Sequence, residues 1–305
     1  MLRRGSLFRK VLVRGGRIAL VAYLGTCLVI SFLQDSLIFP GASTQGRKEA
    51  VVRPSGGEEL VHLTTADGDS VYAIFGKAMN ADGTELADAS TRPTILFFYG
   101  NGMCMADCDE EFRKFRRLGL NAMIPDFVGY GMSGGKPSER GVYATAETAY
   151  AYLISRGDIN PKKIVPAGWS LGAAAAIELA AKHPGPGLVT MSAFTSMTDM
   201  ARKVLPIFPA SLLLKHRFEN EAKLREISCP VLIFHGTQDS IIPFAMSQKL
   251  EAAAKGKAER IAVQNADHND LFEVGGEEMF DAIGKFVDDV TRKNTSATNN
   301  TNEHE

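Results

Sequence analysis

Short apolar runs alternate with helical stretches along most of this chain, and this alternation constrains its fold more than any other feature. Strand-like runs are expected at 94–99, 122–125, 163–167, 188–192, 231–234 and 260–263. Helical stretches are expected between them, at about 107–117 and at 142–155, 171–182, 245–254 and 277–292. Strands that alternate with helices pair in parallel, and helices then cover both faces of the sheet. The pattern predicts an α/β fold with a mainly parallel sheet.

Two further β-rich runs lie within 60–75 and flank Asp67-Gly68, a strong hairpin signal that predicts an antiparallel start to the sheet. With 305 residues, 45% of them hydrophobic, the chain can bury the core of one large domain, which we expect at 36–292. The tail 293–305 is rich in Asn, Thr and Ser and has no apolar residue after Ala297. This composition predicts disorder in the tail.

Residues 1–35 are predicted to form a basic N-terminus and a single transmembrane anchor. Six Lys and Arg residues precede an uncharged apolar run, Ile18–Leu33, and no acidic residue occurs before Asp35. The run is slightly short for a hydrocarbon core about 30 Å thick, but snorkelling of Arg17 and local thinning of the bilayer cover the difference. A cleaved signal peptide and a buried helix are the alternatives, although no small-residue cleavage site follows Leu33. Because Lys and Arg favour the cytoplasmic side, the following domain is expected on the non-cytoplasmic side of the membrane.

Charge and cysteine spacing argue against two classes of protein. The formal net charge of -1 offers no positive field for a phosphate backbone, so no nucleic-acid partner is expected. Cys27, Cys104, Cys108 and Cys229 lack the paired spacings of structural zinc sites. We expect them to be buried or free thiols, without a disulfide between Cys104 and Cys108.

A literal G-x-G-x-x-G occurs at Gly129–Gly134, after an expected strand. The dinucleotide-binding fingerprint requires a helix to begin at the last glycine, so that its N-terminus meets the pyrophosphate. Here Gly135, Lys136 and Pro137 follow instead, which predicts a loop. Because no Walker A or H-E-x-x-H spacing occurs either, no cofactor and no metal are expected.

The sharpest local motif is Gly168-Trp169-Ser170-Leu171-Gly172, which lies between the expected strand 163–167 and the expected helix 171–182. At such a strand-to-helix turn, the serine of G-x-S-x-G is held with its hydroxyl exposed above the sheet. Both glycines are required because side chains there would collide with the neighbouring strand and helix. In this context Ser170 is the candidate nucleophile.

A serine hydroxyl becomes nucleophilic when a base takes its proton, so a histidine and an orienting acid are expected later in the chain. Asp239 follows strand 231–234 and His268 follows strand 260–263. Because functional groups in open α/β sheets gather at the carboxyl ends of strands, these two are the candidate acid and base. Asp199 is the alternative acid, whereas Asp267 is too near His268 in sequence to orient it easily.

The other histidines are poorly placed to act as the base. His62 lies in an early strand, and His183 ends a helix. His216 is expected in a connecting helix and His304 in the tail. His235 immediately precedes the loop that contains the candidate acid, and we expect it to pack in the core with a hydrogen bond to backbone.

Acyl transfer also requires hydrogen-bond donors for the developing oxyanion. The backbone N–H of Leu171, directly after the candidate nucleophile, is expected to be one donor. The N–H of Asn101, in the loop Gly100-Asn101-Gly102-Met103 after strand 94–99, is expected to be the second. The alternative for this loop is a plain glycine-rich turn into a helix.

These residues resemble the single-span α/β-hydrolases that include α/β-hydrolase domain-containing proteins thirteen and seventeen and their bacterial relatives. The resemblance covers about 34–292. It rests on the elbow, on Asp126-Phe127-Val128-Gly129-Tyr130-Gly131-Met132-Ser133-Gly134, and on Val231–Gly236 leading to Asp239 and Ile242-Pro243. It implies an α/β-hydrolase fold with eight strands and a small lid, and its triad corresponds to Ser170, Asp239 and His268.

Two positions depart from the family pattern. Tyr99-Gly100-Asn101-Gly102-Met103 replaces the usual His-Gly-Asn-Ala-Gly, and Val128 replaces a common arginine. The first departure affects the detailed geometry of the oxyanion loop, although a backbone donor is independent of side-chain identity. Some members of the family remove long acyl groups from protein cysteines.

The leading hypothesis is an ester or thioester hydrolase that works through an acyl-enzyme. A serine peptidase and a non-catalytic membrane-tethered binding module are the rivals. Fewer than forty residues separate Ser192 from Pro230, which leaves only a small lid around 197–216 and predicts an open site. The apolar lid residues are expected either to line an acyl groove or to pack onto the sheet; they are Leu205, Ile207, Phe208, Leu212, Leu213 and Leu214. The expected partners are the membrane and a small-molecule or lipid-like acyl substrate, or an acylated protein.

Overall fold

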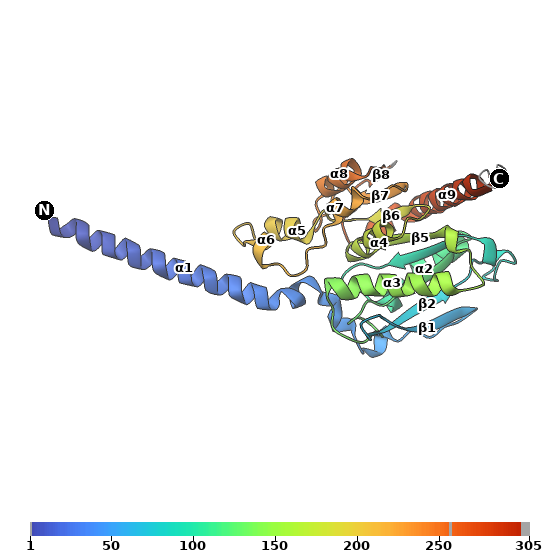
Figure 1. Ribbon diagram of the computed structural model, residues 1–305, viewed down its shortest axis with the longest axis horizontal. Coiled ribbons are helices and arrows are strands. Elements are labelled where there is room, and N and C mark those ends of the chain that lie inside the picture. Colours follow the sequence, from blue (N-terminus) through green and yellow to red (C-terminus); the bar gives the residue numbers. More distant parts are fainter. Residues whose placement is uncertain (1, 256–257, 300–305) are drawn as a thin grey trace.

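The protein is described by a computed structural model that covers residues 2–255 and 258–299. Within these residues, eight strands form one sheet in the order β1-β2-β4-β3-β5-β6-β7-β8 (Figure 1). Strand β2 is antiparallel to both neighbours, and all other adjacent strands are parallel. The strands are β1 (Glu58–Thr64), β2 (Ser70–Gly76), β3 (Thr94–Phe98), β4 (Asn121–Pro125), β5 (Ile164–Trp169), β6 (Leu188–Met191), β7 (Val231–Gly236) and β8 (Ala258–Val263). The predicted sheet, mainly parallel with an antiparallel start, is confirmed.

Helices cover both faces of this sheet. On one face α3 (Glu139–Ser155), α4 (Leu171–Lys182), α7 (Asn220–Leu224) and α8 (Phe244–Ala253) form a connected layer. On the other face α2 (Asp109–Arg117) contacts α9 (Leu271–Asn299). The lid segment, defined here as residues 197–216, contains α5 (Met197–Val204) and α6 (Ala210–Leu213). The predicted small lid of one or two short helices is therefore present.

The five central strands of the sheet are mainly apolar, which fits their burial between the two helical layers. Every residue of β3, β4, β5, β6 and β7 is buried, as expected for strands that are covered on both faces. Helix α4 is buried over Leu171–Ala180, a stretch rich in alanine. These small side chains let α4 lie close to the sheet, and a Cβ built on Gly172 would lie 2.0 Å from the carbonyl oxygen of Phe98 in β3.

The predicted hairpin joins β1 to β2. Gly68 has φ +90°, which a glycine adopts at no steric cost, and its N–H donates to the carbonyl of Thr65 at 2.9 Å. The hairpin register pairs Thr64 with Ser70. This turn returns the chain alongside itself and forms the antiparallel edge of the sheet.

Helix α1 (Leu2–Ile38) is a single rod whose N-terminal part projects away from the sheet and its covering helices (Figure 1). Its part Arg9–Ile38 is long and apolar enough to cross a membrane, with a mean hydropathy of 1.9, and only 6% of its most apolar window is buried. An anchor and a signal sequence both have these properties.

At the other end of the chain, α9 continues to Asn299, beyond the expected helix end at Arg292, because no Pro or Gly interrupts 293–299. Residues 300–305 of the expected disordered tail lie outside the described residues.

Candidate active site

Three loops at the carboxyl edge of the sheet bring together the candidate nucleophile, base and acid. Ser170 follows β5, Asp239 follows β7, and His268 follows β8. The Nε2 atom of His268 lies 3.0 Å from Oγ of Ser170, and its Nδ1 atom lies 2.8 Å from Oδ2 of Asp239. Residues separated by up to 98 positions in sequence therefore form one continuous hydrogen-bonded chain.

The serine lies on a strained turn. Ser170 has φ 55° and ψ -113°, a region that non-glycine residues rarely adopt and that costs on the order of 1–3 kcal/mol. Its N–H donates to the carbonyl of Met191 at 2.9 Å, which ties the turn to β6. A Cβ on Gly168 would lie 2.1 Å from the carbonyl oxygen of Gly172. Both glycines of the motif are therefore required by close backbone approach, as the sequence predicted.

Hydrogen bonds hold Asp239 ionised. Burial disfavours its charged form, but hydrogen bonds from His235 and His268, together with the backbone N–H of Ile242, bring the pKa of the carboxyl well below its usual range. Oδ1 accepts the N–H groups of Ile241 and Ile242 at 3.0 and 2.6 Å. Oδ2 therefore faces the imidazoles as a permanent acceptor.

His235 contributes more to this site than the sequence indicated. Its Nε2 lies 2.9 Å from the carbonyl oxygen of Ile242, which agrees with the expected backbone hydrogen bond. The same nitrogen also lies 3.3 Å from Oδ2 of Asp239. Spacing in the sequence did not reveal this second contact, because the loop after β7 must fold back on itself before the two side chains meet.

The two candidate oxyanion donors belong to two neighbouring segments, the start of α4 and the loop after β3. Leu171 begins α4, so its N–H has no acceptor within the helix, and it has no hydrogen-bond partner among the residues that the structure describes. The loop after β3 packs onto the elbow, since a Cβ on Gly100 would lie 2.9 Å from the Trp169 ring. The Asn101 side chain is held in place at both ends, because its Nδ2 donates to the carbonyl of Ile38 and its Oδ1 accepts from the Tyr130 hydroxyl at 2.8 Å.

Asp126 organises the loops beside the site. Its carboxylate accepts the Tyr99 hydroxyl at 2.9 Å, the Met105 N–H at 2.6 Å and the Met132 N–H at 2.7 Å. Complete burial raises its pKa to about 6 although these three donors oppose the shift. A Cβ on Gly131 would lie 2.1 Å from Oδ2 of Asp126. The sequence identified Asp126 only as part of a motif, and its position directly after β4 was the available signal.

The G-x-G-x-x-G segment is a loop, as predicted. It contains two turns, closed by hydrogen bonds from the N–H of Tyr130 to the carbonyl of Phe127 and from the N–H of Ser133 to the carbonyl of Tyr130, and no helix begins until α3 at Glu139. The Ser133 hydroxyl donates to the carbonyl of Asp126 at 2.9 Å and accepts the N–H of Tyr72 at 3.0 Å. The glycines therefore serve close packing around a buried carboxylate.

The alternative residues lie outside the triad. Asp199 accepts the Thr195 hydroxyl at 2.8 Å and pairs with Arg202 at 3.3 Å in the lid segment. Asp267 accepts the N–H of Ser240 at 2.7 Å and the N–H of His268, and does not bond its imidazole. Each acid thus has partners of its own.

His216 does not lie in a helix, which corrects the expectation. It follows α6 in extended chain, where its Nδ1 accepts the N–H of Glu139 at 3.2 Å and its Nε2 donates to Asp35 at 3.0 Å. The Glu139 carboxylate also accepts the N–H groups of Arg217 and Phe218, so the backbone of this segment bonds α3 and forms no helix of its own. All four cysteines are free thiols, and three of them are buried.

The expectation of an open site is wrong for the triad residues. Ser170 is 7% exposed and His268 is 5% exposed. The Trp169 ring packs against the imidazole of His268, with ring centroids 5.6 Å apart. Lid length alone did not predict this enclosure, because residues of the elbow itself also cover the imidazole.

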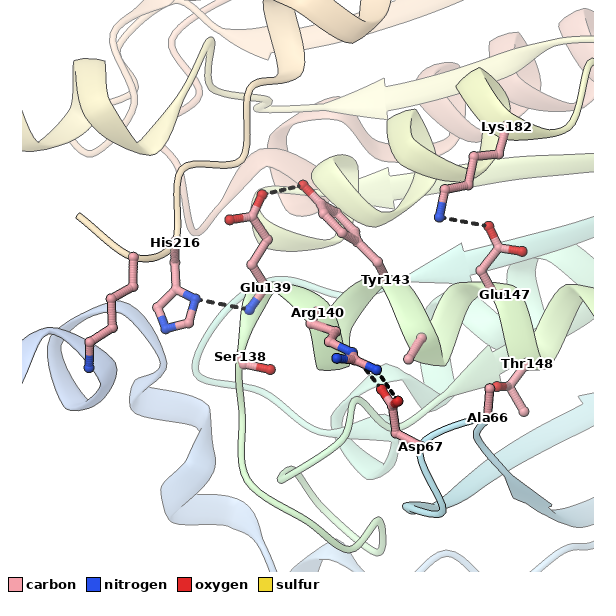
Figure 2. A pocket seen from close by; sticks show the side chains of 12 residues that line it. Ala66, Asp67, Ser138, Glu139, Arg140, Tyr143, Glu147, Thr148, Lys182 and His216 are labelled. Atoms are coloured by element: carbon pink, nitrogen blue, oxygen red, sulfur yellow. Dashed lines mark hydrogen bonds and ion pairs between the residues drawn. The ribbon is translucent and has the colours of Figure 1, made fainter. Parts of the chain in front are cut away.

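A separate surface cleft of about 580 Å³ lies along α3, beside the turn between β1 and β2, the end of α4 and the end of the lid segment (Figure 2). Its charged residues are already paired: Glu139 accepts the Tyr143 hydroxyl at 2.9 Å, and Arg140 donates to Asp67 at 2.7 Å. None of its lining residues belongs to the candidate triad.

Over the described residues, no group of three or more His, Cys, Asp or Glu side chains is arranged to hold a metal ion.

Comparisons with known proteins agree with this architecture. An esterase of Pyrococcus furiosus superimposes with a TM-score of 0.62 at 17% identity, over 78% of this chain and 94% of that one. An uncharacterized protein of Mycobacterium tuberculosis is 34% identical over 195 residues, which cover 64% of this chain and 69% of that protein. Human α/β hydrolase domain-containing protein 17B is 32% identical over 182 residues, which cover 58% of this chain and 61% of that protein, less than two thirds of its length.

A family model described as the dienelactone hydrolase family matches residues 98–269, which is more than half of the chain. The matched range includes the elbow, the loop after β7 and the loop after β8. The expected relationship to α/β-hydrolase domain-containing proteins is also confirmed. The chain is therefore a hydrolase of the α/β-hydrolase fold and belongs to the dienelactone hydrolase family.

Proposed function

We propose that the protein cleaves acyl ester or thioester bonds through Ser170, His268 and Asp239. The observation that carries the proposal is the hydrogen-bonded chain of these three side chains, with contacts of 3.0 and 2.8 Å. Oδ2 of Asp239 accepts a hydrogen bond from Nδ1–H of His268, which leaves Nε2 as a lone-pair acceptor toward the serine hydroxyl. This tautomer is the one that a general base requires.

The reaction proceeds in two acyl transfers. Nε2 of His268 takes the proton from Ser170 as Oγ attacks the substrate carbonyl, and it then gives that proton to the departing alcohol or thiol. The resulting acyl-serine is attacked by water, which the same imidazole deprotonates. The imidazole then returns this proton to Oγ of Ser170 as the bond between Oγ and the acyl carbon breaks and the carboxylic acid leaves. The N–H groups of Leu171 and Asn101 stabilise the oxyanion in both steps, and one such donor is worth roughly 2.7–4 kcal/mol. No cofactor takes part in this scheme.

Substrate class can be tested with the full chain in detergent micelles. We expect hydrolysis of p-nitrophenyl and thioester substrates that carry short to medium acyl chains, with little cleavage of peptide amides. A lipid-like substrate or an acylated protein is the natural partner that this preference favours. Efficient amide cleavage with negligible ester turnover would instead identify a peptidase, and failure of Ser170 to react with a fluorophosphonate would identify a non-catalytic module.

We also propose that α1 anchors the protein in a membrane with the catalytic domain on the non-cytoplasmic side. Six Lys and Arg residues lie before Ile18, and few basic residues follow Leu33 closely. In spheroplasts of an expressing bacterium, protease added outside should therefore digest the domain. Complete protection of the domain in intact spheroplasts, with digestion only after lysis, would place it in the cytoplasm.

A further inference from the structure

One stripe of helix α1 is covered by the domain. Tyr23, Cys27, Ile30, Gln34 and Ile38 are buried or half-buried, whereas most side chains between them are exposed. Their spacing of three to four residues places them on one face of a helix. The C-terminal half of the apolar helix is therefore docked along one side, and its other sides are free.

The lid segment contacts this stripe at two positions along the helix axis, Tyr23 and Gln34. The Tyr23 hydroxyl donates to the carbonyl of Ile207 at 2.7 Å. Further along the helix, the Gln34 amide donates to the carbonyl of Leu213 at 3.4 Å and accepts the N–H of Lys215 at 2.8 Å. Tyr23 and Gln34 are eleven residues apart, which is about 16 Å along a helix. The lid segment thus bonds α1 at both ends of that stretch, through residues 207 and 213–215, and Figure 1 shows α6 above the C-terminal half of α1.

The part of the lid that lies beside α1 is apolar and exposed. From Val204 to Leu214 the segment contains no charged residue. Ile207 is 78% exposed, Leu212 is 80% exposed and Val204 is 69% exposed. These side chains extend the exposed apolar surface of α1, because the hydrogen bond from the Tyr23 hydroxyl to the Ile207 carbonyl brings the two segments together.

The polar side chains of the α1 stripe satisfy lid backbone that would otherwise be unpaired. In hydrocarbon, irregular backbone is tolerated only where protein groups bond it. Tyr23 supplies a donor to the carbonyl of Ile207, and Gln34 supplies both a donor and an acceptor. Charged residues begin only at the two ends of the segment, with Lys203 before it and Lys215 after it. This arrangement fits a loop that enters a bilayer and leaves it again.

We propose that the lid tip, residues 204–214, is inserted in the same bilayer that α1 spans. The inference rests on the proposed anchor, since Tyr23 lies inside the apolar run Ile18–Leu33 and Ile207 is bonded to it. The lid is also tied to the loop of the catalytic acid, because Nζ of Lys203 donates to the carbonyls of Ser240 and Ile241 at 3.3 and 3.0 Å. The rim of the site therefore faces acyl chains that lie within the membrane.

Tryptophan quenching by brominated lipids tests this placement on the full chain. Ile207→Trp and Leu212→Trp are reconstituted separately into vesicles of phosphatidylcholine brominated on its acyl chains. Leu28→Trp reports α1 itself, and Ile154→Trp reports an exposed apolar position at the end of α3 that is remote from α1. The unaltered chain gives the contribution of Trp169, its single native tryptophan.

We expect the two lid tryptophans to be quenched within about twofold of Leu28→Trp, and Ile154→Trp to show no quenching, because bromines on acyl chains reach only groups inside the hydrocarbon. Quenching of Leu28→Trp without quenching of either lid position would overturn the proposal, and so would absence of quenching at all positions. Because the readout does not involve hydrolysis, all variants can carry Ser170→Ala. Loss of the proposed enzyme activity and loss of lid insertion are thus separate results.

Discussion

Ser170→Ala is expected to abolish labelling by a fluorophosphonate and to lower ester hydrolysis by about 10⁴- to 10⁶-fold. The alanine has no Oγ to attack the carbonyl, and His268 loses the group that it deprotonates at 3.0 Å. The measurement is kcat on a p-nitrophenyl ester, together with in-gel labelling of the full chain.

The fold should survive this substitution. Alanine tolerates φ 55° about as poorly as serine does, so the backbone strain at the elbow is the same in both proteins. Circular dichroism and Tm should therefore remain nearly unchanged. Ser155→Ala is the matched control, because Ser155 is an exposed serine at the end of α3 and bonds only the carbonyl of Tyr152. Labelling retained by the Ser170 variant would remove this residue from the mechanism.

Asp239→Asn is expected to lower kcat by about 10⁴-fold, the size of effect seen when the orienting acid of a triad becomes an amide. Oδ1 of Asp239 is occupied by the N–H groups of Ile241 and Ile242, so the new amide nitrogen must replace Oδ2. It would then point a donor at Nδ1 of His268 and stabilise the wrong tautomer. Asp199→Asn tests the alternative acid and should retain activity within a few-fold; the reverse ranking would reassign the triad.

Asp239→Asn should also change how the free energy of unfolding depends on pH. Hydrogen bonds hold the folded pKa of Asp239 below its usual range, so its carboxylate contributes stability that is present above the unfolded pKa of about 3.9. That contribution is lost as the pH falls through the folded pKa. The parent should exceed the variant in free energy of unfolding at pH 7, and the gap should narrow in acid. A gap that widens toward acid pH would contradict this account of Asp239.

Local sequence signals pointed to the three candidate residues because each lies in the turn or loop after a recognisable strand. The turn at Ser170 leaves a clear pattern in the sequence, because both neighbouring positions that need close backbone approach must be glycine. Asp239 and His268 could be ranked because parallel strands end at one edge of a sheet. By contrast, the contact between His235 and Asp239 required the loop after β7 to close, and no spacing rule describes that loop.

Asp126 illustrates a second limit of sequence reasoning. Its carboxylate is bonded by groups from two connections: Tyr99 and Met105 lie between β3 and α2, and Met132 lies between β4 and α3. A residue with so many non-local partners has no periodicity that marks it. The same reason explains why the expectation of an open site failed, since the packing of Trp169 against His268 joins the elbow to the distant loop after β8.

The sequence by itself determined the α/β class, the strand-to-helix turn at Ser170, the order of the candidate acid and the candidate base, and the apolar helix at the N-terminus. Each depends on strand or helix periodicity or on backbone sterics within a short stretch of chain. Only the tertiary structure decided that the triad is enclosed and that the lid segment lies along α1. Tyr23 and Ile207 are 184 residues apart, so their contact exists only when the folded domain brings the lid to the helix. Interactions of that range leave no local pattern, because they are selected by the packing of the whole domain.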